Sequence, residues 1–172
     1  MNEYTIKMKF ILLLICLPQF VLAQASIPKD IQPPKGHNPY LTVYATGVQI
    51  YQCVISQGSY SWQVQAPDAT LYNEKHEIIG KHYKGPIWEY NKGSRIEGRV
   101  VNSLFQSDNA ISWLLVEVVS KHGDGPFSAA TYINRFNTIG GISPITGCDA
   151  NHLGIEKKTT YSASYLFYKP SS

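Results

Sequence analysis

One histidine and one glutamate stand close enough along the chain for acid–base chemistry. His82 precedes the turn residues Gly85 and Pro86, and Glu89 follows them. A turn here can bring the imidazole and the carboxylate together, and a carboxylate partner orients a histidine ring and keeps its pKa near neutrality. His82 and Glu89 are therefore the candidate catalytic residues. In the structural alternative, His82 bonds a loop carbonyl and Glu89 is a solvated strand residue.

Three further side chains are candidates for ligand binding on the strands. Trp88 follows the same turn, and an aromatic ring at such a place can form the wall of a site for a sugar or another small ligand. Arg135 and Asn137 are two residues apart on a predicted strand, so they share one face. On that face they can hold an anion or a polar ligand, or simply fix a loop carbonyl.

Asp149 is the fourth candidate for ligand binding, and it precedes His152 by three residues. With His82 or His122 these two side chains can make a mixed nitrogen and oxygen metal site, but no HxH or HExxH spacing supports one. A cap on a short turn suits Asp149 better, with His152 exposed. We predict no metal and no cofactor. No Gly-x-Ser-x-Gly sequence offers a hydrolase nucleophile either.

The amino-acid composition indicates what kind of fold positions these side chains. The chain has 172 residues, of which 44% are hydrophobic and 16% are charged, which suits one domain with a full core and argues against disorder. A formal net charge of +3 is too weak for nucleic-acid binding, which needs clusters of basic residues. The chain has 12 Tyr, 13 Gly and 10 Pro, a composition that indicates short strands and turns rather than helices.

The N-terminal residues 1–23 have the pattern of a signal peptide. Lys7 and Lys9 precede an apolar stretch at 10–17, and small residues end the segment at Ala23. We therefore predict an exported protein, whether periplasmic, cell-surface or extracellular. Residues 24–40 carry four prolines and are predicted to form an extended leader that lies on or off the domain, followed by a single domain at 41–172. No second hydrophobic segment follows, so we expect no membrane span after the signal is removed.

The cysteines agree with export. Cys16 leaves with the signal, and Cys53 and Cys148 remain as an even pair in an oxidising compartment. One disulfide between them is the simplest interpretation. The alternatives are a catalytic thiol and a pair of metal ligands, but neither cysteine has a CxxC partner.

Short strands separated by turn residues fill the predicted domain. In residues 61–66, apolar and polar side chains alternate, which places Trp62, Val64 and Ala66 toward a core, and Trp113 is also expected in the core. No helix-length amphipathic segment occurs. We predict an all-β, single-domain antiparallel fold with one disulfide, either a β-sandwich or a small β-barrel. The other predicted strands are residues 47–55, 87–90, 94–102, 112–119, 127–137 and 161–168.

Several short sequences together resemble an exported family known as domain of unknown function 3455. They are 47–53 (GVQIYQC), Trp62 with 66–71 (APDATL), 80–89 (GKHYKGPIWE), 113–115 (WLL), 135–141 (RFNTIGG), 147–149 (GCD) and 161–165 (YSASY). The resemblance implies a secreted all-β protein in which Cys53 and Cys148 belong to the motifs. Some members carry a malate dehydrogenase label, which this sequence does not support, because no G-x-G-x-x-G follows a strand.

From these observations we expect a secreted or envelope-associated β-domain that binds a small polar ligand or a glycan without catalysis. One alternative is an envelope hydrolase or lyase that uses His82 and Glu89. The other is a structural surface component or a module for a protein partner, which would expose an aromatic patch and have no enclosing pocket.

Overall fold

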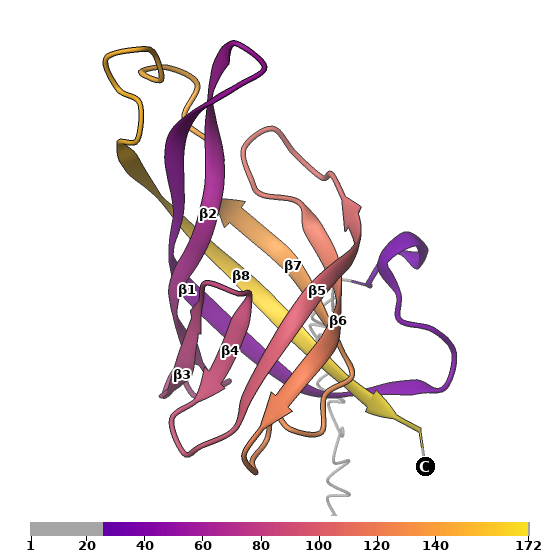
Figure 1. The fold of residues 1–172 in the computed structure, drawn as a ribbon. Coiled ribbons are helices and arrows are strands. Elements are labelled where there is room, and N and C mark those ends of the chain that lie inside the picture. Colours follow the sequence, from indigo (N-terminus) through magenta and orange to yellow (C-terminus); the bar gives the residue numbers. More distant parts are fainter. Residues whose placement is uncertain (1–25, 172) are drawn as a thin grey trace, which may run out of the picture.

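The first and the last strand of this chain lie side by side and close its sheet into a barrel (Figure 1). The computed structural model describes residues 26–171, and within them the secondary structure is all β apart from one 3-10 turn. Each strand pairs antiparallel with the next. The prediction of an antiparallel all-β fold is confirmed, and of the two architectures left open the structure has the barrel. The strands are β1 (His37–Ser56), β2 (Ser59–Tyr72), β3 (Ile78–Tyr83), β4 (Ile87–Tyr90), β5 (Arg95–Leu104), β6 (Trp113–His122), β7 (Tyr132–Gly140) and β8 (Glu156–Pro170).

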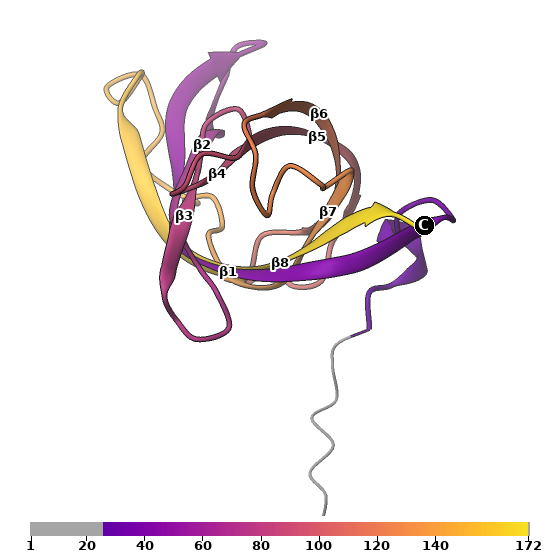
Figure 2. The same ribbon diagram turned by 90° about the horizontal axis from the view of Figure 1, so that it is seen from below.

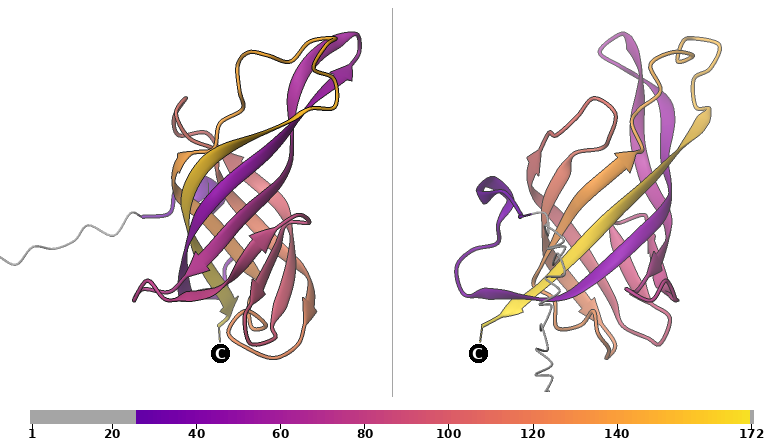
Figure 3. Two further views of the ribbon diagram at one scale, coloured as in Figure 1. Left: turned by 90° about the vertical axis from the view of Figure 1, so that its left-hand side faces the viewer. Right: turned by 180° about the vertical axis from the view of Figure 1, so that it is seen from behind.

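Long β1 and β8 form the seam of the barrel, and both cross it obliquely (Figure 3). Their pairing runs from His37 opposite Pro170 to Gln52 opposite Glu156. Side chains alternate along β1, so that Val43 is buried inside while Tyr44 is exposed. One face of each strand is thereby committed to the interior, which fixes the register of the seam.

One end of the barrel is closed by the segment between β6 and β7. This orange segment turns inward across the barrel when the molecule is viewed from below (Figure 2). Phe127 is fully buried there, stacks on Phe167 with ring centroids 5.0 Å apart, and meets Tyr90 edge-on at 5.6 Å. Aromatic packing of this kind excludes water from the lower half of the barrel, which is therefore a conventional hydrophobic core.

Residues preceding β1 pack on the outside of the barrel. A 3-10 turn, η1 (Lys29–Ile31), buries Ile31 completely, and the Ile31 carbonyl accepts a hydrogen bond from Asn134 Nδ2 at 2.7 Å. The segment that we expected to be an extended leader thus lies against the barrel, and β1 begins at His37. The predicted signal at 1–23 lies outside the described residues. Among residues 26–171, no helix has the length and apolarity to cross a membrane.

Trp62 and Trp113, which we predicted to lie in the core, are both outside the main core cluster. Trp62 and Val64 lie opposite the buried Cys53 and Tyr51 and face inward, but β2 extends beyond the packed core there, and Val64 remains 55% exposed. Ala66 lies opposite Ile50 across a register shift, so it does not share their face, contrary to the prediction. Trp113 is half-buried, meets Phe136 edge-on at 6.2 Å, and lies outside the main core cluster. The alternation assigned side chains to faces, but it could not show how far up the barrel the core extends.

Gly98 on β5 leaves the space that Trp88 occupies, and a larger residue there is expected to destabilise the protein. A Cβ at this position would lie 2.4 Å from Val116 Cγ1 and 3.0 Å from the Trp88 ring. We expect Gly98→Ala to lower the free energy of unfolding by about 1 to 3 kcal/mol, since overpacking forces neighbours to move. Urea unfolding measures this.

The companion variant Val116→Ala removes the closest atom and serves as the control. In its background Gly98→Ala should cost less than in the wild type, because the two substitutions share one contact. Strictly additive effects would contradict the packing explanation.

Candidate functional site

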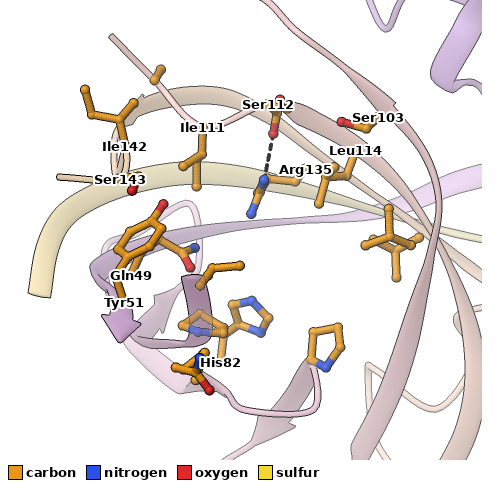
Figure 4. A pocket seen from close by; sticks show the side chains of 18 of the residues that line it. Gln49, Tyr51, His82, Ser103, Ile111, Ser112, Leu114, Arg135, Ile142 and Ser143 are labelled. Atoms are coloured by element: carbon orange, nitrogen blue, oxygen red, sulfur yellow. Dashed lines mark hydrogen bonds between the residues drawn. The ribbon is translucent and has the colours of Figure 1, made fainter. Parts of the chain in front are cut away.

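The other end of the barrel encloses a cavity with a volume of about 990 Å³ (Figure 4). Volumes of roughly 300 to 1,000 Å³ are typical of sites for small molecules. The lining comes from β1 through β8 and from the segments that follow β3, β5 and β7. The cavity is therefore the interior of the barrel itself.

A row of paired residues around the barrel includes His82 and Trp88, which line the cavity. Through the strand registers, Tyr161 lies opposite Gly47, Gly47 opposite Ala69, Ala69 opposite His82, and His82 opposite Trp88. Two small residues thus separate the tyrosine from the large rings. A Cβ on Gly47 would collide with the Ala69 backbone at 2.5 Å, so the two strands approach closely where no side chain fills the row.

His82 is buried at the floor of the cavity and is uncharged at neutral pH. Its Nδ1 lies 2.8 Å from the Ile87 carbonyl oxygen, and its ring stacks on Trp88 with centroids 4.3 Å apart. Burial lowers the pKa of His82 to about 3, against a smaller opposing effect of the bond to Ile87. Because a carbonyl can only accept, Nδ1 carries the hydrogen, and Nε2 is left as a hydrogen-bond acceptor.

Arg135 reaches into the cavity from β7 without an acidic partner. Its Nε and Nη2 donate to the Ser112 carbonyl at 3.1 and 2.8 Å (Figure 4). Ion pairs in the described part of the chain join Arg99 to Glu117 and His152 to Asp149, and none involves Arg135. The guanidinium therefore brings an uncompensated positive charge to the cavity wall, with Nη1 left as a donor.

Three aromatic side chains of β4 and β8 carry buried polar atoms that have no hydrogen-bond partner among the described residues. These atoms are the Tyr165 hydroxyl, the Tyr161 hydroxyl and Trp88 Nε1. Burial raises the pKa of Tyr165, and the nearby Arg135 charge opposes that shift. Burial also raises the pKa of Tyr161. Both hydroxyls are consequently protonated and can donate.

Above this polar floor the cavity wall is mainly apolar, although polar side chains such as Gln63, Gln65 and Ser103 also border it. The side chains that form it come from β2, β5, β6 and the segments next to them, and several remain partly exposed toward the mouth. Trp62 is held at this level by a hydrogen bond from Nε1 to the Thr146 carbonyl at 3.0 Å. The apolar wall residues are Trp62, Val64, Val100, Phe105, Ile111, Leu114, Val116 and Ile142.

A disulfide between Cys53 and Cys148 ties the segment that precedes β8 to β1, as the sequence predicted. The Cys53 backbone adds two hydrogen bonds of 2.9 Å, to the Ile155 carbonyl and from the Gly154 amide. Tyr51 donates its hydroxyl to the Gly141 carbonyl at 2.7 Å. The covalent bond thus fixes part of the cavity mouth, and its presence is compatible with an exported protein.

A family model for a protein of unknown function, DUF3455, matches residues 33–169. The chain belongs to the DUF3455 family. No curated protein and no solved structure matches it. The DUF3455 match spans all eight strands, and it includes the cavity residues His82, Trp88, Arg135 and Tyr165.

In this DUF3455 protein His82 and Glu89 do not come together. β3 and β4 pair so that His82 lies opposite Trp88, and Glu89 lies opposite Lys81. Successive residues of a strand point to opposite faces, so His82 faces the interior while Glu89 is exposed. Glu89 accepts a hydrogen bond from the Tyr83 hydroxyl at 2.5 Å instead. Glu89 is thus an exposed strand residue, as in the structural alternative, and His82 bonds a backbone carbonyl, but that carbonyl belongs to Ile87 in β4 and not to the loop.

Of the four predicted ligand-binding residues, Trp88 and Arg135 line the cavity and Asn137 and Asp149 do not. Asn137 adopts a φ of 48° where the pairing of β7 with β8 shifts register, so it no longer shares a face with Arg135. It lies instead in a small hollow that includes Tyr44 and His76.

Asp149 is an exposed turn residue. Its Oδ1 accepts from the Asn151 amide at 2.9 Å and lies 2.7 Å from His152 Nδ1. The capping alternative therefore describes this aspartate. Within the described residues, no group of three or more histidine, cysteine, aspartate or glutamate side chains is placed to hold a metal ion.

Tyr165 on β8 is a functional candidate that sequence reasoning missed. Alternation in residues 161–168 did place Tyr161 and Tyr165 on one face. Nothing in the pattern distinguished Tyr165 from a core aromatic residue, because only the closed barrel places it opposite Arg135 at the cavity. Gln49, buried on β1 at the same cavity, was also missed, because alternation does not show which inward positions line a cavity.

Proposed function

We propose that this protein is a non-catalytic binding module that holds one small molecule inside the barrel. The supporting observation is a cavity with an apolar wall and a floor of polar atoms that have no partner within the described chain. Leaving a buried donor unpaired costs about 1 to 3 kcal/mol. A ligand that accepts those hydrogen bonds recovers that free energy, and only the bound state does so.

The apolar character of the cavity wall indicates what kind of ligand the cavity can hold. Most of the cavity surface is apolar, and aliphatic side chains such as Ile111 and Leu114 offer no hydrogen bonds to the hydroxyls of a glycan. Trp88 is only 1% exposed and is covered by His82 on one face, so it is not an open stacking platform. We therefore propose a ligand with an apolar body and a polar end.

Catalysis by His82 and Glu89 is not part of the proposal, because the sheet separates the two side chains. A surface role has less support, since the cavity is enclosed by strands and has the size of a ligand site. Export remains a prediction from residues 1–23.

Binding is tested with the purified oxidised protein and the uncharged dye N-phenyl-1-naphthylamine, whose fluorescence rises in apolar surroundings. We expect saturable binding of one dye per chain. Ile111→Trp fills the cavity and should weaken binding at least about tenfold, whereas Val119→Trp adds the same ring to an exposed site outside the cavity.

Both variants should retain the thermal unfolding midpoint of the wild type to within a few degrees. Absence of saturable binding would overturn the proposal. Equal affinities for the wild type and Ile111→Trp would also overturn it, because the dye would then bind elsewhere.

A further inference from the structure

Arg135 sets the electrostatics of the cavity. The charged side chains that line the cavity are Arg135, Lys84 and Asp108, and the last two are exposed. His82 is neutral, so the deep part of the cavity carries one positive charge and no negative one. A charge in low-dielectric surroundings is costly unless it is paired. The guanidinium therefore favours a ligand with one negative charge over a neutral or cationic ligand.

The neighbours of Arg135 are arranged to donate to that negative charge. Tyr165 lies directly opposite Arg135 in the pairing of β7 with β8, and its buried hydroxyl has no partner. Trp88 meets Tyr165 edge-on at 5.5 Å and brings its own unpartnered Nε1 to the same part of the barrel. A tryptophan N–H can only donate, and a protonated tyrosine can donate.

Tyr161 lies four residues before Tyr165 on β8, but it is not among the residues that line the cavity. The buried unpartnered donors of the lining are therefore those of Tyr165 and Trp88, and Arg135 adds its guanidinium. Two oxygens of one carboxylate can together accept three or four such bonds, and hydrogen bonds to a charged acceptor are about twice as strong as neutral ones. A single carboxylate thus matches both the charge and the number of the unpaired donors.

The apolar wall gives the ligand its direction. Leu114 lies opposite Arg135 in the pairing of β6 with β7, so the aliphatic surface begins next to the guanidinium. It continues to the mouth, where Val64 and Phe105 are 55% and 65% exposed. An apolar ligand body can therefore contact side chains along the whole path from the floor to the solvent.

From this arrangement we infer that the ligand is an amphiphilic monocarboxylate. Its carboxylate lies at the Arg135 and Tyr165 end of the cavity, and its apolar body extends toward the mouth. This inference rests on the proposed function and specifies the ligand class. Arg135 binds the head group, and Tyr165 and Trp88 donate to it.

Three compounds with the same alkyl chain test the head group: dodecanoate, dodecan-1-ol and dodecylammonium. Each compound is titrated, below its micelle concentration, into the oxidised protein with bound N-phenyl-1-naphthylamine, and the loss of dye fluorescence measures its affinity. We expect dodecanoate to bind at least about tenfold more tightly than dodecan-1-ol, because it alone pairs with the guanidinium. Dodecylammonium should bind no better than the alcohol.

Arg135→Gln should remove the preference for dodecanoate and leave the affinity for dodecan-1-ol within about threefold of the wild type. The alcohol thereby reports that the cavity of the variant is still folded. Lys84→Gln removes an exposed lysine that lines the same cavity and should retain the full preference.

The outcomes separate this inference from the proposed function. If the dye binds but dodecanoate fails to displace it, or displaces it no better than the alcohol, the inference is overturned and binding in the barrel stands. Loss of the preference in Lys84→Gln rather than in Arg135→Gln also overturns it. If neither the dye nor any of the compounds binds, the proposed function itself fails.

Discussion

Replacing Cys53 and Cys148 by alanine is expected to lower the free energy of unfolding by about 4 to 5 kcal/mol. The two cysteines are 95 residues apart, and a cross-link over so long a loop removes much conformational freedom from the unfolded chain. A protein of this size has a total stability of about 5 to 15 kcal/mol, so the variant should be close to unfolding at 37 °C. Urea unfolding at 25 °C measures the loss.

Reduction of the unaltered protein is the matched control, because it breaks the bond without emptying the space of the fully buried Cys53 sulfur. The reduced protein should lose most of the same stability, and the variant somewhat more. A loss below about 1 kcal/mol in the reduced protein would show that the cross-link does little to the unfolded chain.

Acid should destabilise the protein through His82, by about 3 kcal/mol between pH 7 and pH 4. In the unfolded chain this histidine gains its proton near pH 6.5, whereas burial delays protonation of the folded chain to about pH 3. The unfolded state therefore binds more protons throughout this range. The stability that His82 contributes is complete above pH 6.5 and is lost as the pH falls toward 3.

The difference between the wild type and His82→Gln isolates this contribution from the carboxylates, which titrate in both proteins. The variant is expected to be less stable at pH 7, because it disturbs the bond to Ile87 and the stacking on Trp88. The gap should shrink or reverse by pH 4. A pH profile for His82→Gln parallel to that of the wild type would contradict the assigned burial.

Local patterns were sufficient for the strands and the disulfide, but not for the closure of the sheet. The period-two alternation along residues 161–168 depends only on neighbouring residues, and β8 does contain this segment. Whether eight strands stack as two sheets or close as one depends on the pairing of β1 with β8. That pairing joins the two ends of the domain, and no short-range signal encodes it.

The residues of the candidate site also divide into those that local patterns could predict and those that they could not. Trp88 and Arg135 were predicted as binding residues, and both line the cavity because each lies in a regular strand whose inward face is set by alternation. Glu89 and Asn137 face elsewhere for reasons of register. A hairpin shifted by one residue would have placed Glu89 beside His82, and the irregular turn of β7 after Phe136 rotates Asn137 outward.

Closure by the last strand has a consequence for how this protein folds. Tyr161 and Tyr165 lie on β8, which is synthesised last and must pair with β1, the first strand to emerge. Contacts between such distant parts of a chain form slowly, since a long loop must close before they stabilise anything. Until then the edges of β1 and β7 are unpaired and open to other strands. We therefore expect the seam and the cavity to form together, late in folding.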